Sequence, residues 1–240
     1  MTRKPKHLPS GFTLVELLVV ITIILVLAAL SFLGFGRIRM AADTANTVSN
    51  MRQLQTANVS YATDHNGHYA SYYNRDQKGA KVYWYRTPEF LAYLTGDDSQ
   101  LSESDPSLDV PLNLLDPTVV RARQRWFDNV AASYGMNNEF MTKRNPEDTE
   151  RYIEMNGVTD PSRSFAFITA TDSSAKYAGR TLWWNSPVEG KTTDGKMAFR
   201  HGNKAIAVYF DGSTGFITKG DIERIDAKGG KNNIFWKANY

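Results

Sequence analysis

The chain contains no cysteine among its 240 residues. This absence excludes a disulfide, a thiolate metal site and a cysteine nucleophile. Proline is absent between Pro9 and Pro88, so no residue in that stretch forces a helix to break. Excess charge of one sign is also small, because the formal net charge is only +3. Such a small excess does not indicate a nucleic-acid partner, and we expect none.

Charge is almost absent from residues 12–35, where Glu16 is the only charged residue in an otherwise apolar run. As a helix this run would be roughly 36 Å long, enough to cross a hydrocarbon core of about 30 Å. Arg3, Lys4 and Lys6 precede it, and basic residues before a span favour a cytoplasmic N-terminus. The sequence therefore predicts a single-pass membrane protein with most of its chain on the far side of the membrane.

A secretory signal peptide is the main alternative for this N-terminal region. Its apolar core would be about 7 to 15 residues long and would end at a small-residue cleavage site. Here the apolar run is longer, and the obvious small residue, Gly11, lies before the run. Cleavage at Gly11 would remove the basic leader and keep the apolar helix.

The residues around Gly11, Ser10-Gly11-Phe12-Thr13-Leu14-Val15-Glu16-Leu17-Leu18-Val19, resemble the processing site of type IV prepilins. The resemblance implies cleavage between Gly11 and Phe12 by a prepilin peptidase, and N-methylation of the new amine of Phe12. It also implies that Glu16 acts in assembly by pairing with the N-terminal amine of a neighbouring subunit. An isolated carboxylate costs about 2.5–3.5 kcal/mol inside a membrane, so such a partner would matter.

The resemblance also implies partners and a location. The partners would be the peptidase, other pilin or pseudopilin subunits contacted through the N-terminal helix, and an inner-membrane assembly platform. The protein would be held in the inner membrane, with the N-terminus in the cytoplasm and the rest in the periplasm, until it enters a filament.

Apolar residues continue beyond the span at steps of three or four, which is typical of an amphipathic helix. They are Ile38, Ala41, Ala45, Val48, Met51, Leu54, Ala57 and Tyr61. We therefore expect one helix from about residue 13 to about residue 63. The predicted organisation is a cleaved leader (1–11), a transmembrane or filament-core helix (12–35), an amphipathic second half (36–66) and a globular head (67–240).

The head is predicted to have an α+β fold with an antiparallel sheet, which gives the whole chain a pilin-like architecture. Strands are expected at residues 164–169 and 181–184, where β-branched and aromatic residues gather. Residues 197–219 contain two turn clusters between three apolar runs and predict a three-stranded antiparallel meander. Short helices are expected after Thr87 and within residues 117–127.

His201, followed after nine residues by Asp211 and Gly212, resembles a C-terminal motif found in a subset of prepilin-like proteins. An extended strand between them would separate His201 from Asp211 by about 20–30 Å, which excludes a direct bond or a shared ion within one subunit. We expect structural roles for both residues, with His201 bonded in its own turn and Asp211-Gly212 forming a hairpin turn. A meeting across a subunit contact stays open.

The remaining polar residues do not form a known reactive site. Asp172, Ser173, Asp194 and Asp211 offer oxygen ligands, but their spacing does not match a loop such as the EF-hand. Some major pseudopilins hold calcium, so calcium stays an alternative to the expectation of no cofactor and no metal. No nucleophile or metalloprotease motif is present, and we expect no enzymatic activity.

These observations predict a structural subunit of a type II secretion pseudopilus or of a type IV pilus-like filament. The lack of cysteine differs from the disulfide-closed loop of many adhesive pilins and favours a pseudopilin. The alternative is a membrane-anchored minor pilin that uses its aromatic head as an adhesin or a substrate-binding surface.

Overall fold

The computed structural model describes residues 12–75, 79–96, 110–123, 133–139, 142–143, 151–177 and 197–238. The predicted leader (1–11) and the predicted strand at 181–184 lie outside these ranges. The chain divides into two compact units, Met1–Ala42 and Asp43–Tyr240. The second unit therefore takes in the second half of the long helix as well as the head.

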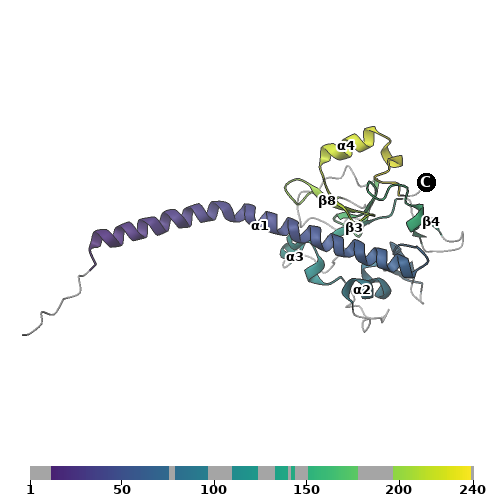
Figure 1. The fold of residues 1–240 in the computed structure, drawn as a ribbon, viewed down its shortest axis with the longest axis horizontal. Coiled ribbons are helices and arrows are strands. Elements are labelled where there is room, and N and C mark those ends of the chain that lie inside the picture. The colour runs from purple at the N-terminus through teal and green to yellow at the C-terminus, as the bar shows by residue number, and fades with distance from the viewer. Residues whose placement is uncertain are drawn as a thin grey trace, which may run out of the picture. The chain divides into compact units, whose positions relative to one another are not determined.

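The long helix α1 runs from Leu14 to Asp64, within one residue of its predicted ends (Figure 1). It ends in a turn where Gly67 takes a left-handed φ of 78° and its amide donates to the carbonyl oxygen of Ala62 at 2.8 Å. Met51 and Leu54, two of the predicted apolar positions, are fully buried in the second unit.

The first half of α1 is the one described segment that is long and apolar enough to cross a membrane. Its most apolar window has a mean hydropathy of 3.0, and none of that window is buried within the protein. The structure thus leaves the side chains of residues 12–30 exposed, as a lipid-facing or partner-facing helix requires.

A five-stranded sheet forms the centre of the second unit, in the order β7-β3-β6-β8-β9. All neighbouring pairs are antiparallel except β3 and β7, which are parallel. The strands are β3 (Tyr134–Asn137), β6 (Phe165–Thr169), β7 (Ser174–Ala175), β8 (Ala205–Tyr209) and β9 (Thr214–Ile217). Two small hairpins accompany the sheet, formed by β1 (Tyr73–Arg75) with β2 (Lys81–Tyr83) and by β4 (Thr142–Lys143) with β5 (Arg151–Tyr152). The prediction of an α+β, pilin-like fold is confirmed.

The predicted three-stranded meander is wrong in its first strand. β8 and β9 form the expected hairpin, but Met197 bridges to Ala170 and not to β8. The reason is that β6 already occupies the second edge of β8. The hydroxyl of Thr169 completes the arrangement, because it donates to the carbonyl oxygen of Ala198 at 2.9 Å and accepts from the amide of Ile206 at 3.0 Å.

The sheet separates two hydrophobic cores, because successive residues of a strand point to opposite faces. On β8, Ile206 and Val208 join a core that includes residues of α1, whereas Ala205 and Ala207 join a second core. We call them the α1-side core and the α4-side core, since the second contains Ile222 of α4 (Lys219–Ala227).

Three shorter helices flank this sheet (Figure 1). α2 (Pro88–Thr95) begins at the predicted Thr87-Pro88, and α3 (Pro117–Arg123) covers the described part of the predicted helix at 117–127. α4 was not predicted. Its signal is the capping box in which Thr218 and Asp221 bond to each other's backbone amides, a pattern readable as Thr-x-x-Asp.

Candidate functional site

The start of α1 holds two of the residues predicted to act in processing and assembly, Phe12 and Glu16, and joins Glu16 to Thr13. The amide and the hydroxyl of Thr13 donate to Glu16 Oε2 at 2.8 Å and 2.7 Å. The amide of Glu16 donates back to the Thr13 hydroxyl at 3.2 Å. This reciprocal pair is a capping box at the helix N-terminus, where the helix dipole also favours a negative charge.

Phe12 lies just before this cap and is 77% exposed, while Gly11 lies outside the described residues. The Glu16 carboxylate therefore has bonding partners within its own chain, one turn from the position at which the predicted cleavage would create an amine. The contribution of Thr13 was not predicted, although the Thr-x-x-Glu spacing is its signal in the sequence.

His201 takes part in a buried network in the second unit. Its Nε2 hydrogen-bonds Asp116 Oδ2 at 3.1 Å, and its Nδ1 lies 3.3 Å from the hydroxyl of Thr44 on α1. The backbone of His201 pairs with Lys204 across the expected turn. The backbone thus bonds within the turn as predicted, but the side chain leaves the turn and reaches two distant elements.

Asp116 is the centre of this network and is fully buried. Arg200 Nη1 lies 3.2 Å from Asp116 Oδ2, and the amide and hydroxyl of Thr118 donate to Asp116 Oδ1 at 2.8 Å and 2.6 Å. Burial raises the pKa of Asp116, but the hydrogen bond with His201 and the charge of Arg200 outweigh burial and hold that pKa well below its usual range. Asp116 is therefore ionised at neutral pH and also caps α3.

The network ties the second half of α1 to the elements around it. Thr44 reaches His201, and the neighbouring Asp43 pairs with Arg121 of α3, with Nη1 to Oδ1 at 2.8 Å. The order carboxylate, imidazole, hydroxyl also occurs in hydrolytic triads. Here the imidazole side chain is only 1% exposed and its carboxylate is shared with Arg200. This geometry suits a structural role, in which the network holds these elements together, better than a catalytic role.

Asp211 and Gly212 form the turn between β8 and β9. Asp211 Oδ1 accepts from the amide and the hydroxyl of Ser213 at 2.9 Å and 2.6 Å, and Gly212 takes a φ of 83°. This turn follows the last residue of β8, whereas His201 precedes the first. The structure places His201 and Asp211 at opposite ends of one strand, and Asp116 is the carboxylate that His201 contacts.

Two of the residues considered as calcium ligands, Asp172 and Asp211, are held in local turns. Asp172 Oδ1 accepts from the amide of Ser173 at 2.6 Å, and Asp211 bonds to Ser213, while Asp194 lies outside the described residues. Within the ranges that the structure describes, no three His, Asp or Glu residues are grouped as a metal site. Calcium stays an untested alternative.

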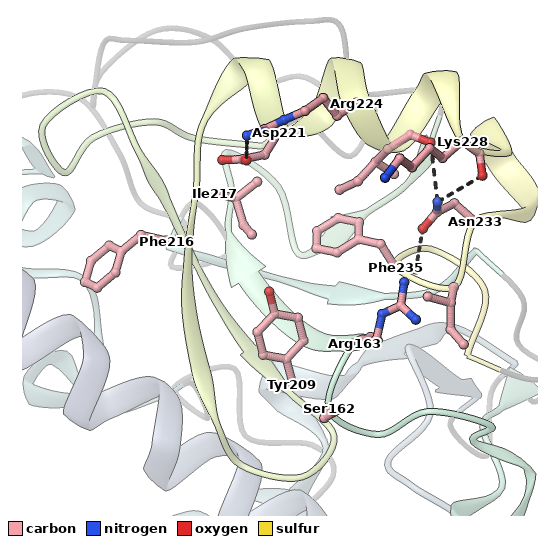
Figure 2. Close-up of a pocket in the computed structure, with 12 residues that line it drawn as sticks. Ser162, Arg163, Tyr209, Phe216, Ile217, Asp221, Arg224, Lys228, Asn233 and Phe235 are labelled. Carbon is pink, nitrogen blue, oxygen red and sulfur yellow. Dashed lines mark hydrogen bonds and ion pairs between the residues drawn. The ribbon is translucent and has the colours of Figure 1, made fainter.

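A groove of about 490 Å³ lies between the β8–β9 hairpin and α4 (Figure 2). Its cationic lining residues are Arg163, Arg224 and Lys228, and its aromatic ones are Tyr209, Phe216 and Phe235. This groove was not predicted from the sequence, because its residues belong to several elements that only the fold brings together. We call it the basic groove.

Comparison with known families agrees with the N-terminal geometry. Residues 9–32 match the family model described as the prokaryotic N-terminal methylation motif. No curated protein and no solved structure matches the chain. The motif indicates a type IV pilin-like protein, and together with the apolar helix it is consistent with anchoring in the inner membrane.

Proposed function

We propose that this chain is a structural subunit of a type II secretion pseudopilus, or of a closely related type IV pilus-like filament. The observation that carries the proposal is the methylation motif at residues 9–32. This motif includes the start of a helix whose most apolar stretch is not buried within the protein. Lipid would cover those side chains before assembly, and the helices of neighbouring subunits would cover them afterwards.

In this proposal a prepilin peptidase cuts between Gly11 and Phe12, and the new amine of Phe12 is methylated. The N-terminus faces the cytoplasm and the head faces the periplasm while the subunit waits in the inner membrane for an assembly platform. The subunit has no enzymatic role and needs no cofactor. The absence of cysteine supports a pseudopilin over a pilin with a disulfide-closed loop.

The alternative role as an adhesive or substrate-binding minor pilin is less well supported. It depends on an exposed aromatic surface, but Trp84 and Tyr85 are only 2% and 6% exposed. The indole of Trp84 donates to the carbonyl oxygen of Ser173 at 2.8 Å, which uses its polar group inside the fold. These two rings are core residues, whereas Tyr72, Tyr73 and Tyr83 are half-buried, so the filament role remains the better supported proposal.

Substitution of Gly11 tests the proposed processing step. In cells that contain a working prepilin peptidase, Gly11→Leu is expected to reduce the cleaved form at least about tenfold, an effect of roughly 1.4 kcal/mol or more on the cleavage barrier. The reason is that a bulky side chain replaces the glycine next to the bond to be cut. Intact-mass measurement of the membrane-purified protein would show the retained leader.

Ser10→Ala is the matched control, because it changes the neighbouring residue without adding bulk, and it should be cleaved like the natural sequence. Sheared-filament recovery, measured in the same cells, should fall with the cleaved form. Normal filament yield from Gly11→Leu with the leader intact would contradict the proposal.

A further inference from the structure

The basic groove is a built surface feature of the α4 side of the sheet. The side-chain amide of Asn233 donates to the carbonyl oxygens of Ile225 and Lys228 at 3.4 Å and 3.3 Å, and its oxygen accepts from the amide of Phe235 at 3.0 Å (Figure 2). These bonds tie the C-terminal segment to the end of α4. The groove therefore exists before any partner arrives, which lowers the cost of binding.

The lining of the groove carries more positive than negative charge. Among the described lining residues, Arg163, Arg224 and Lys228 are cationic and Asp221 is the one carboxylate, while Asp160, outside the lining, lies 3.7 Å from Arg163 Nη1. Hydrogen bonds from Thr218 lower the pKa of Asp221, so this carboxylate is ionised, but it is already bonded in the cap of α4 and to Arg224. The side chains of Arg163 and Arg224 are 69% and 75% exposed. Exposed guanidinium groups in a groove that is also lined by aromatic side chains favour an acidic partner that also carries apolar side chains.

The same chain contains a segment with the complementary composition. Residues 97–109 include no lysine or arginine, and two leucines, Leu101 and Leu108, lie among their acidic residues, which are Asp97, Asp98, Glu103, Asp105 and Asp109. We call residues 97–109 the acidic segment. Its negative charge is complementary to the cations of the groove, and its two leucines could contact the aromatic side chains that line the groove.

The ends of the acidic segment are fixed on the opposite face of the sheet from the groove. α2, which precedes the segment, places Phe90 and Leu91 in the α1-side core, and Val110, which follows it, lies in the same core. The groove is lined by Phe235, and α4 places Ile222 in the α4-side core. Figure 1 likewise shows α2 and α4 on opposite sides of the second unit. Within one copy of the chain, the sheet thus lies between the groove and the two points where the acidic segment joins the fold.

We propose that the basic groove of one subunit binds the acidic segment of a second copy of this chain. Because the two surfaces differ and lie on opposite faces, the contact is heterologous and can repeat from subunit to subunit, as an open filament requires. The inference rests on the proposed filament function. In such a filament, the groove would supply a contact between the heads of neighbouring subunits, in addition to the contact between their N-terminal helices.

Paired cysteines test this contact in the full-length protein, since the natural chain has none. One tagged copy would carry Arg224→Cys and a differently tagged copy Ser102→Cys, expressed together. We expect an oxidised cross-link between the two tags. Glu223→Cys, on α4 but outside the groove lining, is the matched control and should cross-link at least about fivefold less, because residues 223 and 224 point in different directions on a helix.

Charge reversal then tests the specificity of the contact. Adding Arg163→Glu and Lys228→Glu to the Arg224→Cys copy should lower the cross-link about tenfold, since like charges would face each other. Adding Glu103→Lys and Asp105→Lys to the Ser102→Cys copy should restore most of it. The proposal would be overturned if a chain that carries both Arg224→Cys and Ser102→Cys formed the disulfide only within one molecule and not between two molecules.

Filament recovery from the same cells separates this inference from the proposed function. Filaments that form without the cross-link would overturn the groove contact and leave the filament proposal intact. A cross-link in cells without filaments would support the contact and count against the filament proposal. Loss of both would overturn both.

Discussion

Replacing Asp116 by alanine is expected to lower the free energy of unfolding of the second unit by about 3–5 kcal/mol, because Arg200 would remain buried without its partner. The pair is almost completely shielded, with side-chain exposures of 2% for Arg200 and 0% for Asp116. In a domain of this size the melting temperature would fall by roughly 6–20 °C. Near-ultraviolet circular dichroism of the full chain in detergent would report the change.

Asp211→Ala is the matched control for this prediction. Within the described part of the chain, the exposed carboxylate of Asp211 bonds only Ser213, so its loss should cost about 1 kcal/mol or less. The contrast also distinguishes the observed partner of His201 from the one suggested by sequence spacing. Equal effects of the two substitutions would contradict the central position of Asp116.

The contribution of Asp116 should also depend on pH. Its pKa in the folded protein lies below the ordinary value of 3.8, so its stabilising effect is complete above about pH 4 and is lost as the pH falls through the lowered pKa. Asp116→Asn lacks this ionisation. The difference in free energy of unfolding between the natural protein and Asp116→Asn should therefore narrow below about pH 4 in denaturant titrations. A difference that stays constant down to pH 2.5 would contradict the assigned ionisation.

Replacing Glu16 by alanine is expected to reduce filament recovery at least about tenfold while leaving the protein in the membrane. The substitution removes a charge whose insertion costs about 2.5–3.5 kcal/mol, so membrane anchoring should improve if it changes at all. It also removes the proposed partner of a neighbouring subunit's N-terminal amine. Sheared filaments and the membrane fraction, both quantified by immunoblot, would separate these two effects.

Thr13→Ala provides the control for Glu16, because it breaks the capping box but keeps the carboxylate. Loss of a cap costs about 0.5–2 kcal/mol of helix stability, which a long helix tolerates. We expect Thr13→Ala to retain most of its filament yield. If Thr13→Ala and Glu16→Ala lose filaments equally, the role of Glu16 is to start the helix and not to pair with a neighbour.

The features that the sequence predicted well are those that depend on neighbouring residues. The three- and four-residue spacing of Met51, Leu54 and their neighbours predicted α1, because one face of a helix must be buried. The run that became β6 and the turn at Asp211-Gly212 were likewise visible in short stretches. Even α4, which was overlooked, has a local signal in its Thr218–Asp221 capping box.

The features that escaped prediction depend on residues far apart in the chain. Asp116 and His201 are separated by 85 positions, and no spacing rule links a helix cap to a distant turn. The predicted pairing of the first meander strand was wrong for the same reason, because β6 and not the segment at Met197 pairs with the edge of β8. The basic groove brings Arg163 near Arg224 and Lys228, and only folding brings Arg163 close to the other two.

The N-terminus of the mature protein is the most direct test of the filament account. Intact and peptide mass spectrometry of protein purified from membranes with a working prepilin peptidase would identify it. The account predicts a chain that begins at an N-methylated Phe12, with residues 1–11 removed. A chain that still begins at Met1 in such cells would contradict it and would leave a single-span anchor whose head acts in some other way.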